Sequence, residues 1–237
     1  MHELTFILVL TLVAGLAMPA GAALACFEHI RPRWLENELR HTVVAFGGGA
    51  LLSAVALVLV PESIDSLNQL LALLCFASGG AVFMFLDIFL AKRKTSAGQL
   101  VAMLADFIPE AIALGATFTV STSGGLLLAI IITLQNLPEG FNSYREIKSS
   151  TGMQGPKIIL LFAFMALLGP VSGLVGYTLL AESHIVIAGI MMFAAGGILY
   201  IVFQDIAPQV RLRNHWAPPL GAVAGFGLGI LGKMLVV

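Results

Sequence analysis

Charge is scarce in this chain. Asp, Glu, Lys and Arg make up only 11% of its 237 residues, whereas hydrophobic residues make up 59% and the mean hydropathy is +0.99. A soluble protein of this length could not bury so much apolar surface, so the composition indicates an integral membrane protein in contact with the lipid bilayer. The chain has no long basic arm, and its net charge of -1 gives no reason to expect a nucleic-acid partner. Its two cysteines, Cys26 and Cys75, are too few for a disulfide framework.

Catalytic motifs are also missing. The sequence contains no His-Glu-x-x-His, no Gly-x-Ser-x-Gly and no Cys/His constellation, which are the patterns expected of an intramembrane hydrolase. We therefore expect a protein that is not an enzyme and holds no cofactor. The first apolar segment lacks a basic residue before it and is as long as a membrane span, which favours a retained helix over a cleaved signal peptide.

Long apolar segments are what the chain does have. Breaking it at polar clusters gives eight of them, each close to the roughly 20 residues that cross a bilayer. They are residues 5–26, 42–61, 68–91, 98–120, 124–145, 158–181, 185–206 and 217–237. Every backbone polar group must be satisfied inside the membrane, so each segment is expected to be a helix. The prediction is an all-α membrane protein of eight transmembrane helices, with residues 1–237 forming one polytopic domain.

The basic residues orient these helices. Of the 12 Lys and Arg residues, all but Lys233 lie in links on one side of the predicted membrane. They are Arg31, Arg33, Arg40, Lys92, Arg93, Lys94, Arg145, Lys148, Lys157, Arg211 and Arg213. By the positive-inside rule that side is cytoplasmic, so both termini are expected outside a plasma membrane.

A short internal repeat links the second and seventh spans. Gly49-Ala-Leu-Leu-Ser before Pro61 resembles Gly196-Gly-Ile-Leu-Tyr before Pro208, with the same spacing from Gly to Pro. Because spans two and seven cross in opposite directions, the match predicts an inverted repeat of spans 1–3 and 6–8 around a central hairpin of spans 4 and 5. Such repeats are typical of transporters, although membrane helices also reuse Gly and Pro for other reasons.

Three carboxylates interrupt the central hairpin. Asp106 and Glu110 lie in span four and Glu139 lies in span five, and no Lys, Arg or His occurs between Asp106 and Glu139. Ionisable groups at this depth are costly and mark a substrate or ion path by default. A cation must therefore balance them.

The short link at residues 121–125 brings these groups together. Folding spans four and five about it places Glu110 level with Gln135 and Asp106 level with Glu139. Side chains four residues apart share a helix face, and Asn136 lies close to the same face as Glu139. The predicted metal site therefore consists of five oxygen-bearing side chains: Asp106, Glu110, Gln135, Asn136 and Glu139.

Prolines add further oxygen ligands to this site. Pro109 and Pro138 each lack an N–H group and so free the carbonyls of Ala105 and Leu134. Carboxylate, amide and carbonyl oxygens suit Mn, Mg, Ca or Fe(II) as readily as Zn. Carboxylates this close cannot all remain charged without a counter-ion, so metal binding is expected to displace protons.

These motifs resemble those of the ZIP metal transporters. Gln135-Asn-Leu-Pro-Glu-Gly140 is similar to the fifth-helix motif of that family, usually His-Asn-x-Pro-Glu-Gly, and Asp106-Phe-Ile-Pro-Glu110 occupies the place of the fourth-helix motif. The eight spans, the external termini, Pro61-Glu-Ser63 and Gly169-Pro-Val-Ser-Gly-Leu-Val-Gly-Tyr177 also look like that family.

The resemblance implies uptake of a divalent metal as the transported substrate, commonly Zn, with Fe, Mn or Cd in some members. It also implies homodimers and an elevator-like shift. Glu110 and Glu139 match bridging carboxylates of a two-metal site, and Asn136 matches a ligand.

The chain departs from the family pattern at several positions. Asp106 and Gln135 replace motif histidines, Phe107 replaces the Asn that follows the first, and Gly169 replaces an acidic residue. A phenyl ring cannot coordinate metal, so we expect one metal with oxygen-dominated ligands. Two alternatives to inward divalent-metal transport stay open: a non-transporting homologue that senses metal or scaffolds a partner, and a proton or monovalent-cation pathway through the same carboxylates.

Overall fold

The computed structural model describes residues 2–27, 33–93, 96–179, 183–210 and 216–236. In these ranges the chain forms helices and short links, with no strand. The helices are α1 (His2–Phe27), α2 (Arg33–Ala54), α3 (Val60–Ile64), α4 (Gln69–Arg93), α5 (Ser96–Val120), α6 (Thr122–Thr151), α7 (Gly155–Ala166), α8 (Leu168–Leu179), α9 (His184–Ile201), α10 (Ala207–Val210) and α11 (Ala217–Val236). Two π-helical turns, η1 (Val55–Leu59) and η2 (Val202–Ile206), join α2 to α3 and α9 to α10.

These elements make eight membrane-length segments, which confirms the predicted all-α architecture. The α2–η1–α3, α7–α8 and α9–η2–α10 runs are each one of the predicted spans. Seven segments are long and apolar enough to cross a membrane, and α5 contributes a shorter apolar stretch, Phe107–Thr119, within the described residues. The chain is therefore a multi-pass membrane protein.

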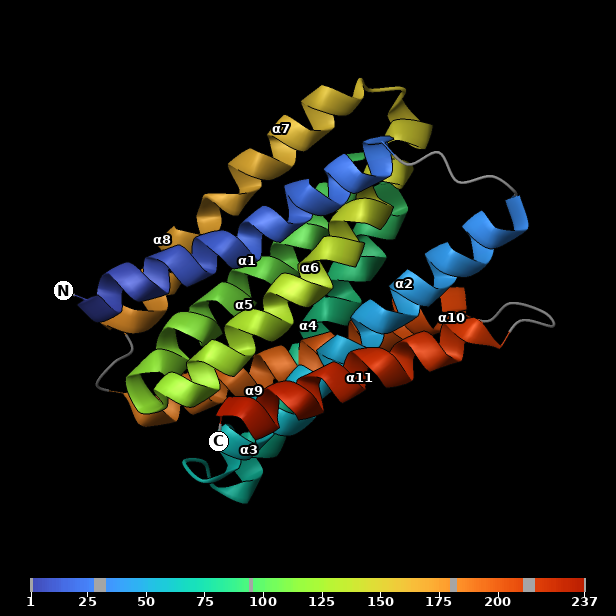
Figure 1. Cartoon of the computed structure of the whole chain (residues 1–237). Helices are drawn as coiled ribbons and strands as arrows, with labels where there is room; N and C mark the ends of the chain where they lie inside the picture. The colour runs from blue at the N-terminus through green and yellow to red at the C-terminus, as the bar shows by residue number, and fades with distance from the viewer. Residues whose placement is uncertain (1, 28–32, 94–95, 180–182, 211–215, 237) are drawn as a thin grey trace.

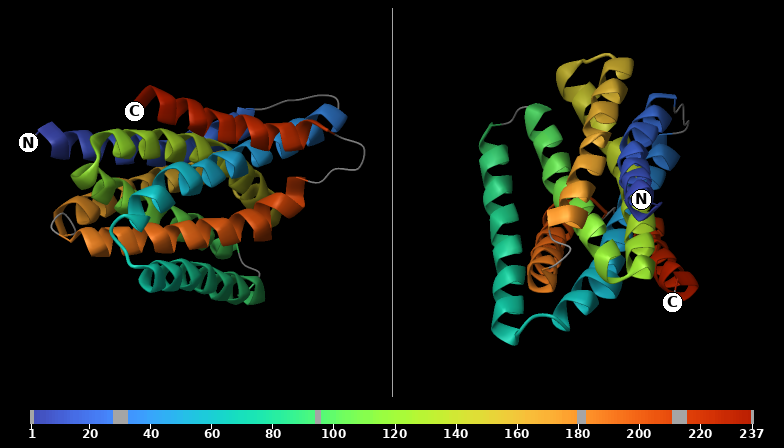
Figure 2. Two further views of the ribbon diagram at one scale, coloured as in Figure 1. Left: turned by 90° about the horizontal axis from the view of Figure 1, so that it is seen from below. Right: turned by 90° about the vertical axis from the view of Figure 1, so that its left-hand side faces the viewer.

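The helices run roughly parallel in one bundle (Figure 1). Both chain ends lie at the same end of it, as an even number of spans requires. The α4 helix runs along one edge of the bundle, and α5 and α6 lie between α1 and α9 (Figure 2).

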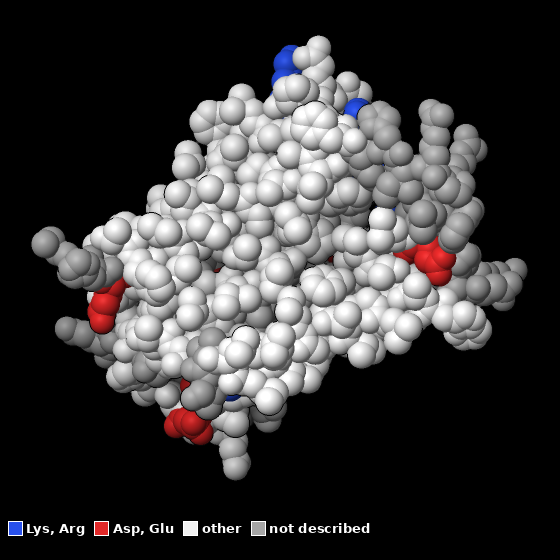
Figure 3. Space-filling view, in the orientation of Figure 1, with Lys and Arg blue, Asp and Glu red and all other residues white. Residues whose placement is uncertain are grey.

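The outer surface is that of a protein in lipid. Large apolar side chains such as Leu73, Phe85 and Val223 are exposed. Figure 3 shows one face of the molecule as a broad uncharged surface, with most of its charges near the margins. Exposed apolar area on this scale is expected where hydrocarbon, not water, surrounds the helices.

Close helix crossings reveal the inverted repeat. A Cβ atom on Gly49 of α2 would collide with the backbone carbonyl of Ala222 in α11, and one on Gly196 of α9 would collide with that of Phe76 in α4. Gly49 and Gly196 are the two glycines that begin the repeated sequence motif. Small residues let membrane helices approach closely. The same kind of glycine crossing therefore occurs twice, between α2 and α11 and between α9 and α4.

The π-helical turns repeat in the same way. In η1 the helix widens so that the Val60 N–H bonds the Val55 carbonyl, and in η2 the Ala207 N–H bonds the Val202 carbonyl. Each turn ends two residues before a proline, Pro61 or Pro208. The inverted repeat is thus a property of the backbone as well as of the sequence.

Candidate metal site

The site lies on the α5–α6 hairpin, whose turn is set by one residue. Ser121 adopts an extended conformation between the two helices, and its hydroxyl accepts a hydrogen bond of 2.9 Å from the Gly124 N–H. This is an N-cap interaction, which satisfies a donor that a helix start would leave free. A Cβ atom on Gly125 would lie 2.7 Å from the Phe118 ring, so a larger residue there would have to displace that ring.

Glu110 and Gln135 meet across the hairpin. The Gln135 side-chain amide donates a 2.5 Å hydrogen bond from Nε2 to Oε1 of Glu110. Both side chains are buried, with only 3% of Glu110 and 4% of Gln135 exposed. The structure therefore brings these two residues level, as the folding of the hairpin about its short link predicts.

Asn136 is held by a different helix. Its Nδ2 donates a 2.9 Å hydrogen bond to the backbone carbonyl of Ala14 in α1. The α1 and α6 helices can approach closely because glycine occupies the crossing, where a Cβ atom on Gly21 or Gly140 would collide with the backbone of the other helix. Sequence reasoning missed this contact with α1, since nothing in the local sequence pairs Ala14 with Asn136.

Three buried oxygens at the site have no hydrogen-bond partner. They are Oε2 of Glu110, Oε1 of Gln135 and Oδ1 of Asn136. An unsatisfied buried acceptor costs about 1–3 kcal/mol, and more if charged. In the hydrogen bonds of Gln135 and Asn136 the bonded atom is the amide nitrogen. The amide oxygens are therefore left for a cation or a hydrogen-bond donor that enters the site.

Asn142 adds an oxygen that sequence reasoning did not single out. Its Oδ1 is also buried without a partner. Asn142 lies three residues beyond Glu139 on α6 and therefore near the same helix face. The i, i+3 spacing from Glu139 was the available signal.

The other two predicted ligands are less constrained by the structure. Glu139 is half-buried on α6 and lies close enough to Glu110 for their charges to interact. The Asp106 side chain lies outside the described residues, although its backbone belongs to α5. Among described side chains, no three His, Cys, Asp or Glu residues form a metal-holding group, so the described oxygens come from two carboxylates and from amides.

Both prolines lie inside continuous helices. Pro109 is within α5 and Pro138 within α6, and neither helix is interrupted. Since proline has no N–H group, the Leu134 carbonyl still lacks the bond that residue 138 would have donated. The freed carbonyl follows from the covalent structure, without an unwound segment.

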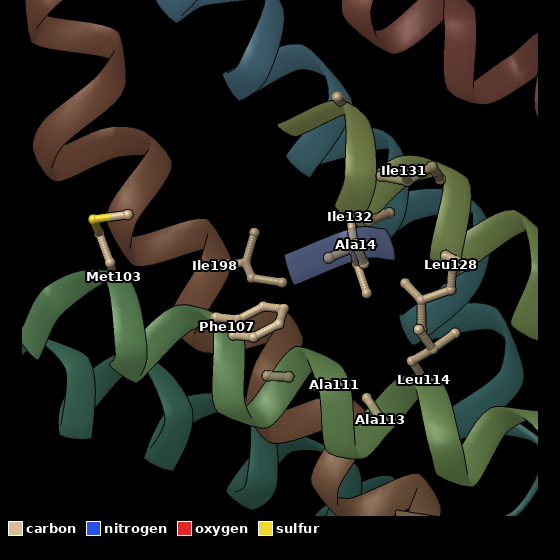
Figure 4. Close-up of a cluster of buried hydrophobic side chains, with 14 of the residues drawn as sticks. Ala14, Met103, Phe107, Ala111, Ala113, Leu114, Leu128, Ile131, Ile132 and Ile198 are labelled. Atoms are coloured by element: carbon tan, nitrogen blue, oxygen red, sulfur yellow. The ribbon is translucent and has the colours of Figure 1, made fainter. Parts of the chain in front are cut away.

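Phe107 fills space beside the hairpin. It is buried, and its Cζ would lie 2.8 Å from a Cβ atom on Gly169 of α8 and 2.9 Å from one on Gly15 of α1. Figure 4 shows the ring directed toward the centre of a cluster that includes Ile198 and Ala14. Two departures from the resembled motifs, Phe107 and Gly169, therefore contact each other, because the ring needs the room that glycine leaves.

Comparison with known proteins identifies the family of this chain. The family model described as ZIP zinc transporter matches residues 93–236, more than half of the chain. A relative, "Zinc transporter YKE4" of Saccharomyces cerevisiae (strain ATCC 204508 / S288c), is 24% identical over 214 residues, covering 71% of this chain and 60% of that protein. The chain thus spans less than two thirds of that relative's length. With eight helical segments and a match that includes the whole α5–α6 hairpin, the chain belongs to the ZIP zinc transporter family.

Proposed function

We propose that this protein carries a divalent metal cation across the membrane, using the buried oxygens between α5 and α6 as its binding site. The observation that carries the proposal is the set of unpartnered buried oxygens on Glu110, Gln135 and Asn136. Membership in a family of transporters supports it and confirms the expectation that the chain is not an enzyme.

A divalent ion fits the charge of this site. Glu110 and Glu139 together offer two negative charges, which balance one divalent ion. The amide oxygens of Gln135 and Asn136 would add uncharged ligands. Hard oxygen ligands suit Mn or Fe(II) as readily as Zn. The relative's name, "Zinc transporter YKE4", supports zinc as the first ion to test. Asp106 is proposed as a third carboxylate.

Inward transport across the plasma membrane is the proposed direction and location. Arg40, Arg145, Lys148 and Lys157 lie in or beside the parts of α2, α6 and α7 at the end opposite the termini. By the positive-inside rule this end is cytoplasmic and the termini are outside. A homodimer rests on the family resemblance alone.

Uptake into reconstituted vesicles tests the proposal. Glu110→Gln and Glu139→Gln each remove one charge while keeping the side-chain shape. Each should lower metal-dependent uptake by at least about tenfold, since losing even an outer-shell partner of a metal ligand typically costs about 10–100-fold. Glu3→Gln is the matched control, because Glu3 is an exposed carboxylate at the N-terminal end of α1, where it accepts a 3.3 Å hydrogen bond from the Tyr177 hydroxyl. Its uptake should equal that of the native chain.

Other outcomes would identify the alternatives. Uptake retained in both variants would refute the site. Metal binding without flux in the native chain would favour a sensing or scaffolding homologue, and a proton current without divalent metal would favour the monovalent pathway. Competition among Zn, Mn, Fe(II) and Cd in the same assay would rank the transported ions.

A further inference from the structure

A deep groove separates the site-bearing helices from the α2–α11 pair. It has a volume of about 510 Å³ and is lined by residues of α1, α2, α6 and α11. Leu24 and Leu39 at its mouth are exposed, so the groove opens to the outside of the bundle. In Figure 1, α2 and α6 diverge toward the end opposite the chain termini.

The wall of the groove is apolar over most of its length. Phe46, Leu134, Leu137 and Pro138 lie along it. Thr42 is a polar wall residue, and its hydroxyl donates a 2.7 Å hydrogen bond to the Glu38 carbonyl. A wall of this kind does not hold ordered water, which needs several polar partners, and it suits a hydrocarbon chain.

The depth of the groove matches one leaflet of a bilayer. On α6 it extends from Leu134 to Arg145, a rise of about 16 Å at 1.5 Å per residue. Half of a hydrocarbon core that is about 30 Å thick is about 15 Å. An acyl chain lying in the groove would therefore reach from the interface to the level of Leu134.

Two arginines stand at the mouth. Arg40 of α2 and Arg145 of α6 both line the groove at the same end, and the Arg145 guanidinium lies 5.6 Å from the centre of the Phe141 ring. Phe141 also lines the groove, so the guanidinium lies beside its wall. Guanidinium groups pair with phosphate through two parallel hydrogen bonds, which makes Arg the preferred residue for phosphate recognition.

We propose that this groove binds an anionic phospholipid, with one acyl chain against Phe46 and Leu137 and the phosphate between Arg40 and Arg145. The proposal goes beyond metal transport and does not depend on it. Charge complementarity selects the occupant. The groove is positive only at its mouth and apolar below, and an anionic lipid has a negative headgroup above apolar tails. Basic pockets between helices on the cytoplasmic side bind acidic headgroups in this way.

The bound lipid would touch the transport site from behind. Pro138 lines the groove, and the neighbouring Glu139 belongs to the proposed metal site. Gly47 of α2 lies against Pro138 on the same side, where a Cβ atom would be 3.2 Å from Pro138 Cγ. An acyl chain in the groove therefore lies between α6 and α2, and its loss would change the contact between the hairpin and the α2–α11 pair.

Native mass spectrometry of the purified full chain in micelles containing equal amounts of phosphatidylglycerol and phosphatidylcholine tests the proposal. The native chain should retain phosphatidylglycerol in preference to phosphatidylcholine. Arg40→Gln and Arg145→Gln should each weaken that preference about fivefold, as expected for one basic residue near an anionic surface. Ala224→Phe, which fills the groove from α11, should reduce retention of both lipids.

Lys157→Gln is the matched control, because Lys157 is an exposed cation at the start of α7 and is not among the groove residues. It should leave the lipid preference unchanged. Equal retention of the two lipids, or the same loss in Lys157→Gln as in the arginine variants, would overturn the proposal. Displacement of the lipid by soluble glycerol phosphate would show a site for free anions instead. A lipid-free dimer that Ala224→Phe dissociates would show that a second copy of the chain fills the groove.

Discussion

The α5–α6 hairpin and the α2–α11 crossing bring helices together for different purposes. At the α2–α11 crossing, glycine lets backbones meet, as Gly49 does against the Ala222 carbonyl. At the hairpin, side chains meet, and the contact between Glu110 and Gln135 leaves buried oxygens without partners. The α2–α11 crossing packs backbones closely. The α5–α6 hairpin leaves buried oxygens without partners, which lowers stability by an amount that a bound cation would offset.

Prolines sharpen the same contrast. Pro109 and Pro138 lie inside continuous α-helices beside the site, whereas Pro61 and Pro208 each follow a π-helical turn in the repeated pair. A π-helical turn shifts the helix register and is often found at functional positions. The two halves of the inverted repeat carry this distortion at the same place, so it belongs to the architecture and not to one helix.

The first prediction breaks the packing side of the comparison. Gly49→Val and Gly196→Val should each destabilise the fold by about 1–3 kcal/mol or more, because the new side chain must displace a backbone carbonyl. Gly227→Val is the matched control, since nothing lies within 4 Å of a Cβ atom there. Thermal unfolding in detergent measures the effect. Similar losses at positions 49 and 196 are expected from the repeat, and a tolerated change at either would contradict the described crossing.

A second prediction concerns the space beside the hairpin. Phe107→Asn should place a polar group where the phenyl ring now lies, and should raise the number of metal ions bound per chain. Phe107→Ala alone should open a cavity and cost about 3–5 kcal/mol without adding a metal. Metal content after equilibrium dialysis and thermal unfolding distinguish the two. An unchanged metal content in Phe107→Asn would show that the ring is not what limits the site.

The smallest expected effect comes from removing the unpartnered buried oxygens at the site, which lower the stability of the metal-free protein. Replacing Glu110 and Gln135 together with leucine removes two of the unpartnered oxygens, so the metal-free protein should become more stable by about 1–3 kcal/mol. Metal should stabilise the native chain and not this variant. Thermal unfolding with and without Zn measures both differences. A destabilised variant would mean that the buried oxygens are satisfied in the metal-free protein.

Sequence alone predicted the parts of this molecule that depend on local pattern. Apolar length gave the eight helical segments, and helix spacing brought Glu110 level with Gln135. The repeat of Gly49 and Gly196 was visible as a short motif, and the structure extends it to the crossings and to the π-helical turns. The described side chains leave the role of Asp106 as a prediction.

Contacts between segments far apart in the sequence could not be predicted from local sequence patterns. The hydrogen bond from Asn136 to the Ala14 carbonyl and the contact of Phe107 with Gly169 each join residues from different spans. Neither alanine nor glycine signals its partner, because what each contributes is a backbone carbonyl or empty space. The π-helical turns were missed for a similar reason, since a proline predicts a disturbed helix but not which disturbance.

The single-residue link at Ser121 limits how the hairpin can move. One extended residue spans no more than about 3.6 Å, so α5 and α6 cannot slide past each other by a helical turn while that link stays intact. Any ion held between α5 and α6 would therefore move together with both helices. Relative movement would then occur at the interfaces between this hairpin and the surrounding helices. At one of these interfaces, between α6 and the α2–α11 pair, the proposed lipid tail would lie.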